Sequence, residues 1–179
     1  RRKRIASEHV LFHPERVIQE YFTMTPIFSG MPTVEAQAFR QGAKDVYGNP
    51  PEHQISSGVG VPCRHCLKIV PKGAGVLVLA YRPFDGLHPY AETGPIFLCA
   101  DSCAAPEQDV LPDVLTASPQ YLIKGYTEDQ RIKYGTGAIV PKEEATTKIK
   151  ELLQQSDLAF VDIRSASNNC WLMRAQRQS

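Results

Sequence analysis

The chain has 179 residues, of which 42% are hydrophobic and 22% charged, a composition typical of one globular domain and not of a disordered chain. Its 20 lysine and arginine residues against 19 acidic residues leave a formal charge of +1, so we expect no overall attraction to nucleic acid or to an anionic membrane. The longest apolar run, residues 76–81, is far shorter than the roughly 20 residues that cross a bilayer, which predicts a soluble protein.

The first 23 residues differ in charge from the rest of the chain. They hold five basic and three acidic side chains, so residues 24–179 carry a formal charge of −1. The four basic residues at the start resemble a nucleic-acid patch or the start of a signal peptide, but no apolar stretch follows them, and a solvated terminus explains them as well. We interpret residues 1–23 as a peripheral extension with a short helix after Pro14, and residues 24–179 as a single domain.

Residues 33–98 predict a short helix followed by two strands. Thr33 is a suitable N-cap, and Gly42 is a suitable stop for the helix. Residues 48–62 combine proline, glycine and serine without periodicity, which indicates a loop. The apolar runs 76–81 and 95–98 are typical of strands and are separated by a turn-rich segment.

The second half of the chain predicts two hairpins around one helix. Residues 121–126 and 131–140 flank a polar connection of four residues, 127–130. Residues 142–155 show helical periodicity, with Ala145, Ile149 and Leu152 on one face. Segments 158–164 and 170–175 flank a second turn. We therefore predict an α+β fold: a mostly antiparallel sheet, one strong helix (142–155), one or two short N-terminal helices and a zinc-knuckle-like insertion.

The last hairpin predicts a polar face. A symmetric register pairs Arg164 with Cys170, and side chains alternate along each strand. One face then carries Phe160, Asp162, Arg164, Cys170, Leu172 and Arg174. The opposite face carries Ala159, Val161, Ile163, Trp171 and Met173, which we expect to form core.

Four of the five cysteines have the spacing of a metal site. The pattern C-x2-C-x32-C-x3-C places Cys63 and Cys66 on a tight turn and Cys99 and Cys103 after a strand, and four thiolates form the closed tetrahedral shell of structural zinc. His65 is an alternative ligand within the turn. Buried free thiols and a redox pair are the other interpretations, although no helix follows Cys66 as a redox pair requires. An odd cysteine count with this motif favours a reducing, cytoplasmic location.

The segments GVPCRHCL, AYRPF, PYAETGPIFL, RIKYGTG and RSASNNC resemble a bacterial family of small proteins, domain of unknown function twelve hundred and three, over roughly residues 26–177. The resemblance implies no established activity. It implies that histidine often replaces Cys99 in close relatives, which fits a metal site, and that distant relatives lack part of the cysteine set. It also implies that histidine often stands where this chain has Asp162, so a His/Cys pair is not available here.

Two hypotheses follow for function. The first is a structural-zinc-containing binding or interaction module. The second is an enzyme or binder of a small anionic ligand that uses the turn from Asp162 to Cys170, with Cys170 as a candidate nucleophile, although no general base is evident. The ligand-binding residues expected for this second hypothesis are Arg82, Tyr90, Glu92, Arg131, Arg164 and Asn169, because guanidinium groups bind carboxylate or phosphate through paired hydrogen bonds.

Overall fold

A computed structural model describes residues 25–107 and 110–178. The elements in chain order are β1 (Ile27–Ser29), α2 (Thr33–Arg40), β2 (Glu52–Ile55), β3 (Gly75–Tyr81), β4 (Gly94–Cys99), the 3-10 helix η1 (Asp113–Thr116), β5 (Gln120–Tyr126), β6 (Ala138–Pro141), α3 (Lys142–Leu153), β7 (Phe160–Ser165) and β8 (Trp171–Gln176). The helix predicted after Pro14 lies outside the described residues. Neither α-helix in the described ranges is long and apolar enough to cross a membrane.

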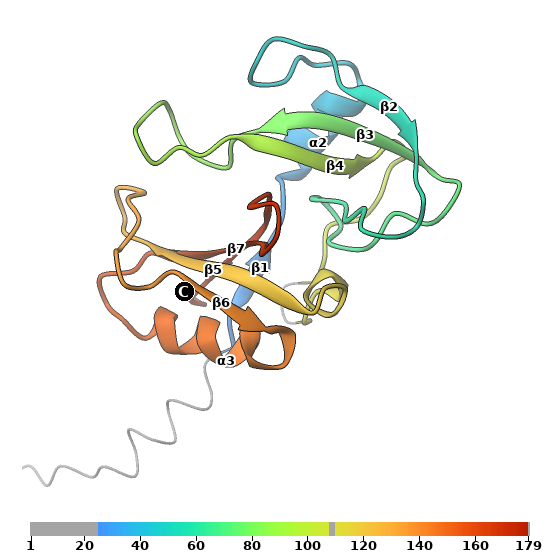
Figure 1. Ribbon diagram of the computed structural model, residues 1–179. Helices are drawn as coiled ribbons and strands as arrows, with labels where there is room; N and C mark the ends of the chain where they lie inside the picture. Colours follow the sequence, from blue (N-terminus) through green and yellow to red (C-terminus); the bar gives the residue numbers. More distant parts are fainter. Residues whose placement is uncertain (1–24, 108–109, 179) are drawn as a thin grey trace, which may run out of the picture.

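The strands form two sheets, where the sequence predicted a single mostly antiparallel sheet. The larger has the order β1-β8-β7-β5-β6 and the smaller the order β2-β3-β4, and all neighbouring strands in both are antiparallel. Figure 1 shows the smaller sheet above the larger one, with α3 below. This order of layers gives the molecule two apolar interiors, one on each face of the larger sheet.

Helix α3 covers one face of the five-stranded sheet. It buries Ala145, Ile149, Leu152 and Leu153, the positions that its periodicity places on one stripe. These side chains pack against Ile123, among others, in the sheet. The helix ends at Leu153, two residues before the predicted end.

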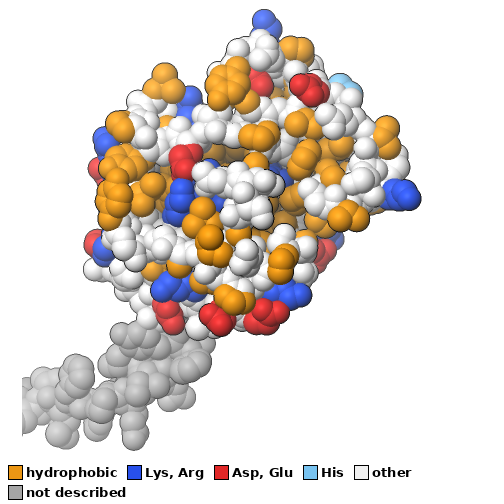
Figure 2. All heavy atoms as spheres, viewed as in Figure 1, with side chains coloured by type: hydrophobic (Ala, Val, Ile, Leu, Met, Phe, Trp, Pro, Cys, Tyr) orange, Lys and Arg blue, Asp and Glu red, His pale blue; other side chains and the backbone are white. Residues whose placement is uncertain are grey.

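The opposite face of the larger sheet meets the three-stranded sheet. An apolar cluster lies where the small sheet and α2 meet the larger sheet. It includes Ala36, Leu77, Leu98 and Trp171. The Trp171 ring lies 5.6 Å from that of Tyr81, measured between centroids. Figure 2 shows that this side of the molecule carries charged side chains of both signs and is hollowed between the two sheets.

The hairpin of β5 and β6 differs from the prediction. Tyr126 and Ile132 form an isolated bridge next to the predicted connection, but β6 begins only at Ala138. Between these points the hydroxyl of Thr136 accepts a hydrogen bond of 3.0 Å from the Gly125 N–H and donates one of 2.6 Å to the Lys133 carbonyl. The Thr136 side chain therefore takes the place of the next backbone partner of Gly125. The prediction of one long second strand over residues 131–140 was wrong.

The predicted register of β7 and β8 was also wrong. Asp162 lies opposite Arg174, and Arg164 lies opposite Trp171, with an irregularity between Ile163 and Arg164. Such a bulge changes which face the following side chains occupy. Trp171 therefore joins the cluster between the sheets, while Leu172 joins the core under α3, the reverse of the predicted placement.

Candidate metal centre

The first cysteine pair lies on a tight turn that backbone hydrogen bonds close. Pro62 and Ile69 form an antiparallel bridge across it, the Cys63 N–H donates to the Lys68 carbonyl at 2.9 Å, and the Leu67 N–H donates to the Cys63 carbonyl at 3.0 Å. Leu67 has a φ of 55°, in the left-handed region that closes a turn of this kind. The turn therefore brings Cys63 and Cys66 to one side of the loop.

Strand β4 brings the second pair to the first. Cys63 bridges Phe97 in parallel, and the Arg64 N–H donates to the Phe97 carbonyl at 2.9 Å, so the end of β4 lies against the turn. Cys99 is the last residue of β4, and its N–H donates to the Cys63 sulfur at 3.3 Å. The β3–β4 hairpin supplies the return that the long middle segment between the cysteine pairs requires.

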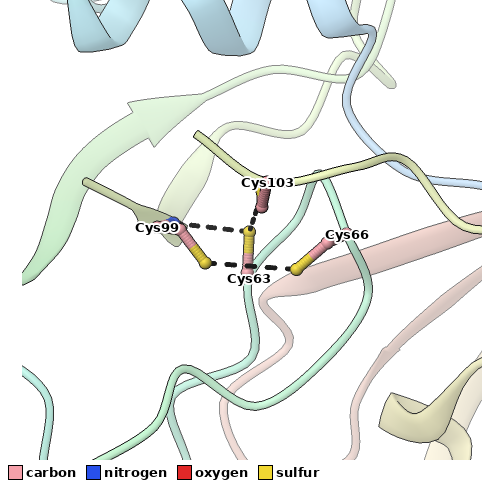
Figure 3. A group of neighbouring side chains, drawn as sticks. All are labelled: Cys63, Cys66, Cys99 and Cys103. Carbon is pink, nitrogen blue, oxygen red and sulfur yellow. Dashed lines mark hydrogen bonds between the residues drawn. The ribbon is translucent and has the colours of Figure 1, made fainter. Parts of the chain in front are cut away.

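The four sulfurs of Cys63, Cys66, Cys99 and Cys103 converge, as Figure 3 shows. All lie within 4.8 Å of one another; Cys63 Sγ is 3.9 Å from Cys103 Sγ, and Cys66 Sγ is 4.0 Å from Cys99 Sγ. A disulfide requires about 2.05 Å. A tetrahedron with Zn–S bonds of about 2.3 Å has edges of about 3.8 Å. The observed separations therefore suit a shared metal ion and not two disulfides.

Protonation of the cluster is uneven without a cation. Hydrogen bonds from the Cys103, Cys66 and Cys99 thiols lower the pKa of Cys63, and the hydrogen bond from Cys103 contributes most to lowering the pKa of Cys66 to about 7. The pKa of Cys99 is raised, because its thiol donates first to Cys103 and then to Cys63 and Cys66, and the pKa of Cys103 is raised, because its thiol donates to Cys63 and Cys66. A bound cation removes this restriction by stabilising all four thiolates together.

Two side chains donate hydrogen bonds at the edge of the cluster. Arg40, at the end of α2, donates from Nη2 to Cys103 Sγ at 3.0 Å and from Nε to the Cys99 carbonyl at 3.0 Å. His65 Nδ1 is 3.1 Å from Cys103 Sγ, and its Nε2 is 2.9 Å from Thr33 Oγ1. Burial and the Arg40 charge lower the pKa of His65. A neutral ring that donates from Nδ1 and accepts from Thr33 fits these contacts, so His65 lies beside the sulfurs as a hydrogen-bond partner.

Arg64 connects the cysteine turn to the larger sheet. Its Nε donates to the Trp171 carbonyl at 2.6 Å, and its Nη1 donates to the Pro62 carbonyl at 2.6 Å. Its own carbonyl accepts from the Met31 N–H at 2.6 Å, and a Cβ at Gly30 would overlap that oxygen. The turn therefore touches both the β1–α2 connection and β8. Neither Arg40 nor Arg64 was singled out from the sequence, since no local pattern marks either one.

Some of the predicted ligand-binding residues lie together around Glu92. Its carboxylate accepts hydrogen bonds of 2.9 Å from Lys124 and Tyr126 and one of 3.3 Å from Asn169, and it lies 3.3 Å from Arg164 Nη1. Burial alone would raise the pKa of Glu92, but these partners outweigh it and lower the pKa. Lys124 and Tyr126 were missed from the sequence.

The remaining predicted residues lie elsewhere. The Arg131 guanidinium stacks over the Tyr90 ring at 5.3 Å, and Arg82 lines a cavity of about 260 Å³ that none of the other predicted ligand residues lines. The structure thus does not gather the predicted anion-binding residues at one place.

The candidate nucleophile Cys170 is partly buried in the β7–β8 turn. Its thiol contacts the Asn168 carbonyl at 3.6 Å. The arginines expected beside it have other partners: Arg174 pairs with the fully buried Asp162 at 2.8 Å, and Arg164 donates to the Asn169 carbonyl at 2.9 Å. Within residues 25–107 and 110–178, neither arginine forms a hydrogen bond with Cys170.

Comparison with known proteins places the chain in a family. Residues 60–177, about two thirds of the chain, match the model of a family described as protein of unknown function (DUF1203). Comparison with curated proteins found no match, and comparison with solved structures found none either. All four clustered cysteines lie within the matched segment. The chain therefore belongs to the DUF1203 family.

Proposed function

We propose that the protein is a binding or interaction module whose fold is completed by a structural zinc ion held by Cys63, Cys66, Cys99 and Cys103. The observation that carries the proposal is the convergence of these four sulfurs at separations close to those of a tetrahedral site. A shell of four thiolates leaves no open position for water or substrate, so the ion would have a structural role.

The charges around the sulfurs support the proposal. Four thiolates and one divalent zinc ion together carry a charge of about −2. Arg40 donates directly to one sulfur, Cys103 Sγ, at 3.0 Å. Hydrogen bonds to coordinating atoms orient ligands and tune metal affinity. This cation would stabilise the negative site without acting as a ligand.

The position of the cluster indicates what the ion would stabilise. Two ligands come from the turn at residues 62–69, and two from β4 and the segment after it. The turn is also bonded to β8 through Arg64. The ion would therefore fix the small sheet, which has only three strands, in its position against the larger sheet.

Metal analysis tests this proposal. Protein purified without tags and without chelators is expected to contain one zinc ion per chain, and Cys99→Ser is expected to lose it. Cys170→Ser is the matched control, because Cys170 is outside the cluster, and it is expected to keep the metal. Absence of metal from the wild-type protein would contradict the proposal, and stoichiometric iron would contradict the assignment to zinc.

Fluorescence of the only tryptophan provides a structural readout. Trp171 is 4% exposed and lies in the cluster between the sheets. Removal of zinc by a chelator is expected to loosen the small sheet and shift Trp171 emission to longer wavelength, and zinc readdition is expected to restore it. Unchanged emission after complete metal removal would contradict the structural role.

A further inference from the structure

A cavity of about 240 Å³ lies between the two sheets, next to the turn that joins β7 and β8. Pro62, Arg64 and Phe97 line it from the cysteine turn and β4, and Ser165, Asn168 and Cys170 line it from the β7–β8 turn. The volume is below the roughly 300 to 1,000 Å³ of pockets for drug-sized ligands, so the cavity suits a small molecule.

Arg64 is the only charged residue among those that line this cavity, and it is 2% exposed. Its Nε and Nη1 donate to carbonyl oxygens, which do not neutralise its charge. Within residues 25–107 and 110–178, its Nη2 forms no hydrogen bond, and no carboxylate lies within ion-pair distance of the guanidinium. A buried cation without an acidic partner attracts an anion, because burial makes an unpaired charge costly.

Cys170 lines the same cavity as this cation. The arginine guanidinium is protonated at neutral pH. A thiol and a buried guanidinium therefore line the same small cavity, the thiol from the β7–β8 turn and the guanidinium from the cysteine turn.

We infer that this cavity binds a small organic carboxylate, with Arg64 pairing with the carboxylate group and the Cys170 thiol beside the rest of the ligand. A single guanidinium matches one carboxylate charge and offers it a planar donor edge, whereas phosphate carries more charge than one arginine balances. The apolar residues Phe97, Val114 and Leu172 also line the cavity, beside the space for a carbon skeleton. This site differs from the one that the sequence suggested, because its cation is Arg64 and not Arg82, Arg131 or Arg164.

Affinity labelling of Cys170 tests the inference directly. Iodoacetate and iodoacetamide react by the same step: the Cys170 sulfur bonds to the methylene carbon, iodide leaves with the electron pair of the C–I bond, and the thiol proton goes to solvent. The two reagents have similar size, and only iodoacetate carries a carboxylate. Peptide mapping identifies the labelled cysteine, and Cys170→Ser confirms the assignment.

We expect iodoacetate to label Cys170 with saturation kinetics. The ratio of the iodoacetate rate to the iodoacetamide rate should be about tenfold higher in the folded protein than in the urea-unfolded protein. This is the effect of one hydrogen bond to a charged group. Acetate should slow labelling by iodoacetate through competition and leave labelling by iodoacetamide unchanged. A ratio equal to that of the unfolded chain, without saturation or competition, would overturn the inference.

Variants at Arg64 identify the residue that reads the carboxylate. Arg64→Gln is expected to abolish the preference for iodoacetate, and Arg64→Lys to retain part of it, while Arg82→Gln, at the other cavity, should leave it unchanged. Zinc content and Trp171 emission report whether each variant is folded. If Arg64→Gln does not fold, acetate competition in the wild-type protein decides. A preference that persists in folded Arg64→Gln would refute the role of Arg64.

Discussion

Substitution of Gly30 by alanine tests the contact between the β1–α2 connection and the cysteine turn. A Cβ at this position would overlap the Arg64 carbonyl oxygen and meet Leu67 Cδ2 at 3.0 Å. That oxygen also accepts the 2.6 Å hydrogen bond from Met31. The overlap can be relieved by straining the packing, which costs about 1 to 3 kcal/mol of stability. It can also be relieved by moving the β1–α2 connection away from the cysteine turn, which leaves the Met31 N–H unpaired at a similar cost.

The opposing contribution is small. Alanine stabilises the protein by about 0.4 to 1 kcal/mol where its backbone fits, because it restricts the unfolded chain. We therefore expect Gly30→Ala to lower the free energy of unfolding by about 1 to 3 kcal/mol in urea denaturation, with an unchanged m value. Gly94→Ala is the control, since a Cβ there meets nothing within 4 Å, and it should stay within about 0.5 kcal/mol of wild type. Equal stability of Gly30→Ala and wild type would refute the reasoning.

Three further predictions concern other polar contacts. Arg40→Ala removes the donor to Cys103 Sγ and is expected to weaken zinc affinity by about 10- to 100-fold in a chelator competition, with no change if the contact is incidental. The pKa of Glu92 is lower in the folded chain than the ordinary value of 4.5, so the unfolded chain binds more protons as the pH falls through that range. In urea unfolding, wild type should therefore be more stable than Glu92→Gln at pH 7, and this difference should shrink as the pH falls below about 4.5. A difference that does not change with pH would contradict the lowered pKa of Glu92. Thr136→Ala leaves the buried Gly125 N–H unpaired and should cost about 1 to 3 kcal/mol in the same assay, and Thr136→Ser, which keeps the hydroxyl, should cost clearly less.

Local sequence patterns predicted those parts of the fold that local chemistry determines. The spacing of Ala145, Ile149 and Leu152 places one stripe against the sheet. The apolar runs around the turn-rich segment 82–94 correspond to β3 and β4, and their antiparallel pairing brings Cys99 to Cys63. Cysteine spacing thus selected four residues that the structure places together.

Long-range pairing could not be read in the same way. Strand β2 has four exposed residues, so no apolar alternation marks it. The division into two sheets depends on which distant strands pair, and no local pattern encodes that choice. The bulge between Ile163 and Arg164 exchanged the faces of Trp171 and Leu172, because one irregular residue reverses the alternation of side chains. Arg40 lies in the last turn of a helix, where a basic side chain usually only interacts with the helix dipole.

The pairing of β1 with β8 and of β2 with β3 determines how much of the chain the two sheets need. The family match starts at residue 60, but β1 pairs with β8 and β2 pairs with β3, so each sheet takes a strand from the segment before the match. A chain trimmed to residues 60–177 would expose the backbone donors and acceptors of β8 and β3 along two new sheet edges. Unprotected edges pair with other chains, so that fragment should aggregate where the longer chain does not.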